Sequence, residues 1–152
     1  MAEIWFYHLD RWPLDRALPA LLEKSVGRGW RAVVQASSPE RIDALDLLLW
    51  TYDEASFLAH GTMRDGDAAL QPIVLTDRSD NPNGAAIRFM VDGAEVMPAL
   101  DGASYERVVL MFDGNDADER AGARRQWADL KKAGHDVAYW QQSEDGRWEK
   151  RG

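Results

Sequence analysis

The sequence predicts a single three-layer α/β domain, in which a mostly parallel, Rossmann-like sheet is flanked by helices. Three observations favour this fold. Short β-branched runs alternate with amphipathic helical segments, so successive strands need crossover connections, and these connections place helices on the sheet faces. The chain has 152 residues, of which 45% are hydrophobic and 29% charged, a composition and length that suit one domain with one core. It contains no internal repeat and no low-complexity segment.

The first strand and helix occupy the N-terminal part of the chain. The run EIWFYHL, residues 3–9, is aromatic and β-branched, which is typical of a strand. A helix is expected from Pro13, because apolar residues then recur at spacings of three and four: Leu14, Leu18, Leu21, Leu22 and Val26. Gly27 and Gly29 stop this helix.

The second strand and helix follow directly. The apolar run WRAVVQA, residues 30–36, predicts a buried strand. Ser38 suits an N-cap with Pro39 at the first helical position. One face of the segment that follows, which runs to Trp50, is apolar and consists of Ile42, Leu45, Leu48 and Leu49. These signals predict a second helix.

The middle of the chain is predicted to hold two strands close together in sequence. Residues 61–70 are expected to form a loop, and residues 71–77 and 85–93 are expected to form strands. Only the turn-like segment DRSDNPNGA joins these strands. We therefore expect either an antiparallel pair or a switch point in the sheet.

The last third repeats the alternation. Residues 105–114 are β-branched and predict a strand, residues 116–134 a helix closed by Gly134, and residues 135–142 a final strand. The domain is thus expected over 1–142. Residues 143–152 are expected to be a polar, frayed C-terminal tail apart from Trp148.

Charge and composition exclude several classes of protein. The net charge of -8 and pI of about 4.8 oppose general binding to nucleic acid, so we expect only indirect contact with DNA. The chain has no cysteine, which excludes disulfides and thiolate chemistry. We expect a cytoplasmic protein, because the N-terminus lacks the features of a signal peptide and no apolar run reaches the ~18 residues of a membrane span.

Motifs for catalysis and cofactors are missing. The first strand-to-helix turn, HLDRWPLD, has none of the glycines of a dinucleotide site, and the sequence contains neither a P-loop nor a G-x-S-x-G elbow. His60 and His135 lack ligand-type partners at i+2 or i+4, so we expect neither cofactor nor metal. His8 and Asp10 form a conceivable general-base pair, and the alternative function is therefore a small nucleotide- or flavin-dependent enzyme using that crevice. A partly buried histidine with one hydrogen bond is the favoured interpretation of His8.

The last predicted helix carries a basic stripe around one indole. Arg120, Arg124, Trp127 and Lys131 are spaced by four, three and four residues, so they share one face. At i, i+4 spacing Asp116 pairs with Arg120 and Arg125 with Asp129, which leaves Arg124 without a helical partner. The pattern fits either a solvated helix face or a site for a carboxylate beside an apolar side chain.

The chain resembles the chi subunit of bacterial DNA polymerase III. Four stretches carry the resemblance, in order along nearly the whole chain: FYHL, ALDLLLWTYDEASFLAHG, NPNGAAIRFMVDG with YERVVLMFDGND, and ARRQWADLKKAGHDVAYWQQ. Two spacings are specific in combination. One is W-x6-F-x2-H, from Trp50 through Phe57 to His60, and the other is R-x3-R-x2-aromatic, from Arg120 to Trp127.

This resemblance implies a non-catalytic adaptor of the DNA polymerase III holoenzyme. Members of the family bind the acidic C-terminal tail of single-stranded DNA-binding protein, which ends in an aromatic residue, and bind the psi subunit of the clamp loader. By matching positions, Trp50 and Phe57 are expected to line the apolar part of the tail site, and Arg120 and Arg124 to receive its carboxylates. Trp127 stands where the family often has tyrosine, so the aromatic face is kept but the hydroxyl is lost. The psi surface is not assigned to residues.

Overall fold

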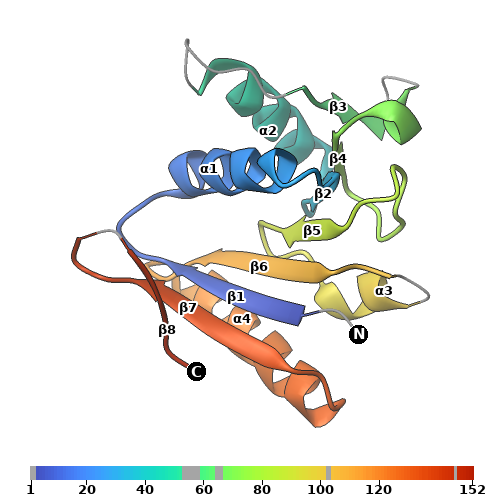
Figure 1. Cartoon of the computed structure of the whole chain (residues 1–152). Coiled ribbons are helices and arrows are strands. Elements are labelled where there is room, and N and C mark those ends of the chain that lie inside the picture. The colour runs from blue at the N-terminus through green and yellow to red at the C-terminus, as the bar shows by residue number, and fades with distance from the viewer. Residues whose placement is uncertain (1–2, 53–58, 64–66, 102–103, 146) are drawn as a thin grey trace.

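An eight-stranded sheet forms the centre of the molecule in the computed structural model, which describes residues 3–52, 59–63, 67–101, 104–145 and 147–152 (Figure 1). The strands follow the order β3-β4-β2-β5-β6-β1-β7-β8 across the sheet. Their bounds are β1 Glu3–Leu9, β2 Ala32–Gln35, β3 Gly61–Thr62, β4 Ile73–Thr76, β5 Ile87–Met90, β6 Arg107–Asp113, β7 Val137–Gln142 and β8 Trp148–Lys150. Every neighbouring pair is parallel except β7 and β8. The predicted mostly parallel α/β sheet is confirmed.

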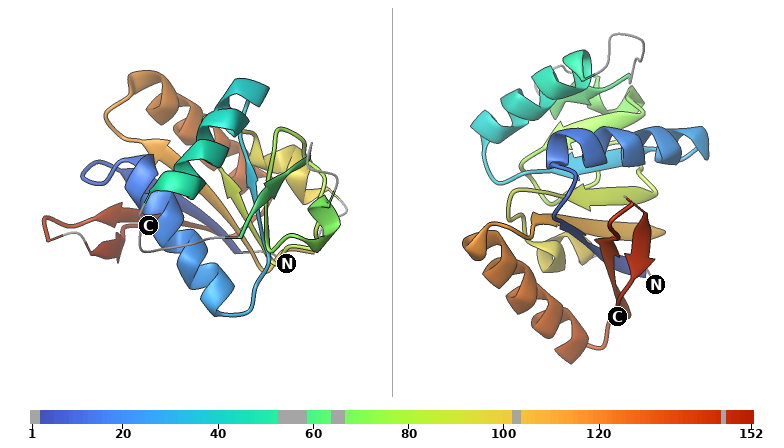
Figure 2. Two further views of the ribbon diagram at one scale, coloured as in Figure 1. Left: turned by 90° about the horizontal axis from the view of Figure 1, so that it is seen from above. Right: turned by 90° about the vertical axis from the view of Figure 1, so that its left-hand side faces the viewer.

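Helices cover both faces of the sheet. They are α1 Leu14–Gly27, α2 Pro39–Thr51, α3 Val96–Leu100 and α4 Ala117–Lys132, with a short 3-10 turn, η2, at Ala68–Leu70. Figure 1 and the right-hand view of Figure 2 show α1 and α2 side by side and away from α4. The Tyr52 hydroxyl, just after α2, donates to Glu23 of α1. In the described part of the chain, no helix is long and apolar enough to span a membrane.

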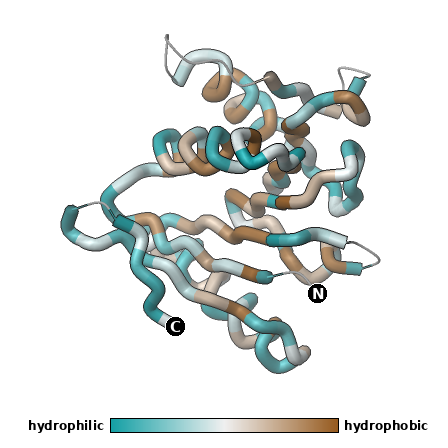
Figure 3. Tube along the Cα trace, viewed as in Figure 1, coloured by the Kyte–Doolittle hydropathy of each residue, from teal (hydrophilic) through white to brown (hydrophobic). Residues whose placement is uncertain are grey.

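Alternating side chains of the strands divide the core into two halves. In β1, Ile4 and Phe6 pack with residues of α3 and α4, whereas Tyr7 and Leu9 pack with residues of α1 and α2. Successive side chains of a strand point to opposite faces, so α1 and α2 lie on one face and α3 and α4 on the other. Figure 3 shows that the C-terminal segment is largely hydrophilic.

The two strands in the middle of the chain do not form an antiparallel pair. β4 and β5 lie on opposite sides of β2 and are both parallel to it, with Val33 paired to Val74 on one side and Arg88 on the other. The connection between them must therefore cross the end of β2 without a helix. The guanidinium of Arg88, which is fully buried, donates to the carbonyl oxygens of Arg78 and Asp80 and anchors this crossing.

The C-terminal tail was predicted to be frayed apart from Trp148, which is wrong for the two residues after it. Trp148–Lys150 forms β8 and pairs antiparallel with β7, and the indole of Trp148 lies 4.6 Å from the ring of Tyr7. The burial of this aromatic side chain outweighs the polar character of its neighbours. Three further elements escaped prediction: β3 and η2, which lie within the expected loop 61–70, and α3.

Candidate functional site

A pocket of about 250 Å³ lies between α4 and the strands β1, β6 and β7. Its walls combine aromatic side chains from the sheet with basic side chains from the helix: Phe6, His8, Phe112, Arg120, Ala123, Arg124, Trp127 and Tyr139. We call it the α4 pocket. Three of the five predicted site residues, Arg120, Arg124 and Trp127, are thus brought together.

The floor of the α4 pocket is aromatic. Trp127 is half-buried and meets Phe6 edge to face, with ring centroids 5.4 Å apart. It meets Tyr139 in the same way at 5.8 Å, and Phe112 lies 6.2 Å from Tyr139. Edge-to-face contacts of this kind hold rings in fixed orientations. The floor is therefore a preformed apolar surface.

The rim of the α4 pocket is positively charged. Arg124 is exposed and, among the residues whose placement is described, makes neither a hydrogen bond nor an ion pair. Arg120 donates from Nη1 to the carbonyl oxygen of Gly114 at 3.0 Å. Asp116 does not serve as its partner, because its carboxylate caps α4 by accepting from the amides of Asp118 and Glu119. The Lys131 ammonium lies 5.0 Å from the centre of the Trp127 ring.

One histidine lies beside this floor. Nδ1 of His8 shares a hydrogen bond with the hydroxyl of Tyr139, and its ring covers Gly114 so closely that an added Cβ there would meet Nε2 at 1.8 Å. Any larger residue at position 114 would have to displace the His8 ring. Burial lowers the pKa of His8 below its ordinary 6.5, and Arg120 lowers it further, while Asp10 and Asp113 oppose the shift. The lowered pKa favours the neutral imidazole, and the interpretation of a partly buried histidine with one hydrogen bond is confirmed.

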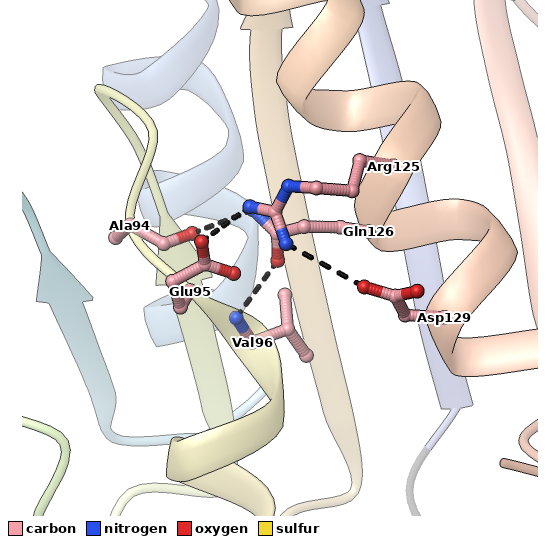
Figure 4. Close-up of polar contacts among 6 residues, drawn as sticks. All are labelled: Ala94, Glu95, Val96, Arg125, Gln126 and Asp129. Carbon is pink, nitrogen blue, oxygen red and sulfur yellow. Dashed lines mark hydrogen bonds and ion pairs between the residues drawn. The ribbon is translucent and has the colours of Figure 1, made fainter.

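Two neighbouring side chains of α4 attach the helix to the start of α3 (Figure 4). Gln126 is buried, accepts from the amide of Val96 at 2.9 Å and donates to the carbonyl of Ala94 at 3.1 Å. Arg125, exposed on the same side, binds Glu95 and, at 3.5 Å, Asp129. The predicted Arg125 to Asp129 pair is therefore present. These contacts turn the opposite side of α4, with Arg124, toward the α4 pocket.

The structure does not gather all five predicted residues into one site. Trp50 lies in the last turn of α2 with 53% of its surface exposed, and its ring meets His60 at 4.7 Å. The sheet separates it from Trp127, because α2 and α4 pack on opposite faces. The expectation that both indoles line one notch is therefore wrong. Phe57 lies outside the described residues.

His8 and Asp10, which were expected to share one crevice, line two different cavities. A cavity of about 310 Å³ at the carboxyl ends of the strands is lined by Asp10, Arg11 and Trp12 among others. His8 instead lines the α4 pocket on the far side of β1, and Asp10 accepts a hydrogen bond from Gln141 at 3.0 Å. Within the described ranges, no cluster of three or more histidines or carboxylates is placed to hold a metal ion.

The α4 pocket has the chemistry to hold a carboxylate next to an aromatic ring. Guanidinium groups form the strong, charge-assisted hydrogen bonds that carboxylates accept, and the aromatic floor provides apolar area. The helical spacing identified the cations and Trp127, but not Phe6, Phe112 and Tyr139. Phe6 shares a strand face with His8, and this two-residue period is the one sequence signal that could have indicated the floor.

Comparison with known proteins places these features in one family. Residues 1–138 match the model of the family described as DNA polymerase III chi subunit, HolC. The chain is also 26% identical over 117 residues to a protein of Rickettsia prowazekii (strain Madrid E) described as probable DNA polymerase III subunit chi. That alignment covers 74% of this chain and 71% of the relative.

Proposed function

Because the chain belongs to the DNA polymerase III chi subunit family, we propose that it is a non-catalytic replisome adaptor for single-stranded DNA-binding protein. It binds the acidic C-terminal tail of that protein in the α4 pocket. It links the tail to the clamp loader through the psi subunit, works in the cytoplasm and contacts DNA only indirectly. The link through psi rests on family membership alone, and we assign no residues to it.

One observation carries the tail proposal, namely the Arg124 guanidinium at the rim of the aromatic α4 pocket. Among the described residues it has no anionic partner, so a tail carboxylate need not displace one. Each charge-assisted hydrogen bond contributes roughly 1.5 to 3 kcal/mol, and burial of the tail's last ring about 1.5 to 3 kcal/mol. Association costs on the order of 4 to 15 kcal/mol. A short tail is therefore expected to bind at about micromolar strength, as suits a transient handover.

The charge distribution supports the same ligand. The whole chain carries a net charge of -8 and repels an acidic tail at long range. Helix α4, however, contains five basic and three acidic side chains, so attraction is local to its rim. Salt screens interactions between exposed charges, and the affinity for the tail should fall as the ionic strength rises.

Replacement of Arg124 tests the proposal. We expect R124A to weaken binding of an acidic peptide with a C-terminal aromatic residue by at least about tenfold, or ~1.4 kcal/mol, in calorimetry. K132A is the matched control, because it removes one positive charge from the same helix at a position that does not line the α4 pocket. A peptide without its last aromatic residue should also bind more weakly. Equal affinity of wild type and R124A would refute the assignment.

A further inference from the structure

The Tyr139 hydroxyl lies at the junction of the aromatic floor and the basic rim. It belongs to β7, lines the α4 pocket and shares a hydrogen bond with Nδ1 of His8. The guanidinium of Arg124 is close enough to lower the pKa of this phenol, although burial has the larger effect and raises the pKa overall. A carboxylate bound by Arg124 would therefore lie beside the Tyr139 hydroxyl. The orientation of the O–H bond decides whether this hydroxyl attracts or repels the carboxylate.

The proton of that hydroxyl can serve only one acceptor at a time. A tyrosine hydroxyl has one hydrogen to donate, whereas a neutral imidazole has one nitrogen that donates and one that accepts. If Nδ1 of His8 accepts, the Tyr139 proton points at the imidazole and the oxygen lone pairs face the α4 pocket, where they repel an anion. If Nδ1 carries the proton, it donates to the Tyr139 oxygen, and the phenolic proton turns toward the ligand.

We propose that His8 is a positioning and specificity-determining residue of the α4 pocket, which directs the Tyr139 hydroxyl to donate to a carboxylate of the bound tail. This inference rests on the proposed function. The ring of His8 is well suited to the role because its position is fixed, with Gly114 beneath it and the ring of Phe112 at 5.0 Å. His8 acts through Tyr139 and need not touch the ligand itself.

The arrangement couples tail binding to protonation of His8. The imidazolium form always carries a proton on Nδ1, so it always leaves the Tyr139 proton for the ligand. The charged groups that face His8 are Asp10 directly after its own strand, Asp113 at the end of β6 and Arg120 on α4. A bound carboxylate adds negative charge and favours the imidazolium. Binding then takes up a proton, and affinity rises as the pH falls.

Calorimetry of an N-acetylated acidic peptide with a C-terminal aromatic residue tests this coupling between pH 6 and pH 8, where peptide carboxylates stay ionised. We expect wild type to bind about three- to tenfold more tightly at pH 6, with proton uptake visible when buffers of different ionisation enthalpy are compared. In H8N an amide nitrogen replaces Nδ1 without titrating, so the affinity should become independent of pH. Y139F should weaken the same dependence, because it retains the ring and His8 but lacks the hydroxyl through which His8 acts.

H135Q is the matched control, because it removes a histidine that does not line the α4 pocket, and it should retain the full pH dependence. If the peptide binds with the expected loss in R124A but H8N and Y139F keep the wild-type pH dependence, the role of His8 is refuted and the tail proposal stands. If wild type and R124A bind equally, the proposed function fails, and the role of His8 fails with it.

Discussion

Replacement of Gln126 by leucine should destabilise the domain strongly, because this buried side chain attaches α4 to the start of α3. The amide of Val96 and the carbonyl of Ala94 are both satisfied by Gln126. Both of these residues are buried, so water cannot replace the lost partner. A buried backbone group without a partner costs about 1 to 3 kcal/mol, and the two groups together predict a loss of ~2 to 6 kcal/mol.

The adjacent Arg125 provides the comparison that separates buried from exposed contacts. Its ion pairs with Glu95 and Asp129 join side chains that are each about half exposed, and exposed pairs contribute about 0.2 to 1 kcal/mol each. Urea unfolding followed by circular dichroism should therefore rank Q126L well below R125A in free energy of unfolding. If R125A costs as much as Q126L or more, the exposed ion pairs hold α4 and the reasoning from burial is refuted.

Two further outcomes follow from the placement of side chains. R88M should lower the free energy of unfolding by about 2 to 5 kcal/mol, because it leaves Gln35 and the Tyr105 hydroxyl without their guanidinium donor; a loss below ~1 kcal/mol in urea unfolding would contradict this. W50A should change the affinity for a short tail peptide by less than about twofold, because the sheet separates Trp50 from Arg124. A calorimetric loss comparable to that of R124A would show that Trp50 contributes to the tail site.

Local sequence patterns predicted most elements because each depends on neighbouring residues. Ser38 does cap α2, where its side chain accepts from the amide of Arg41, and the strands 3–9, 105–114 and 135–142 occur at or within the expected bounds. The order of strands could not be predicted in the same way. The segment between β4 and β5 looks like a turn, but only long-range contacts to β2 and the buried Arg88 decide that the two strands lie apart.

The candidate site likewise contains residues that local spacing predicted and residues that only the fold brought together. Arg120, Arg124 and Trp127 share a helix face, so the spacing alone brought them together. Local sequence could not decide whether Trp50 lies near Trp127, because that depends on which face of the sheet α2 covers. Phe6 and Tyr139 lie on β1 and β7, which are far apart in the chain and adjacent in the sheet.

The sequence by itself determined the α/β class, the helices and strands that follow local periodicity, and the basic stripe around Trp127. These features arise from interactions among residues within a few positions of each other. The tertiary structure alone decided that strands β1, β6 and β7 supply an aromatic floor to that stripe, and that Trp50 lies on the other face. The physical reason is that strand order and helix placement follow from burying two separate halves of one core, a condition that no local segment specifies.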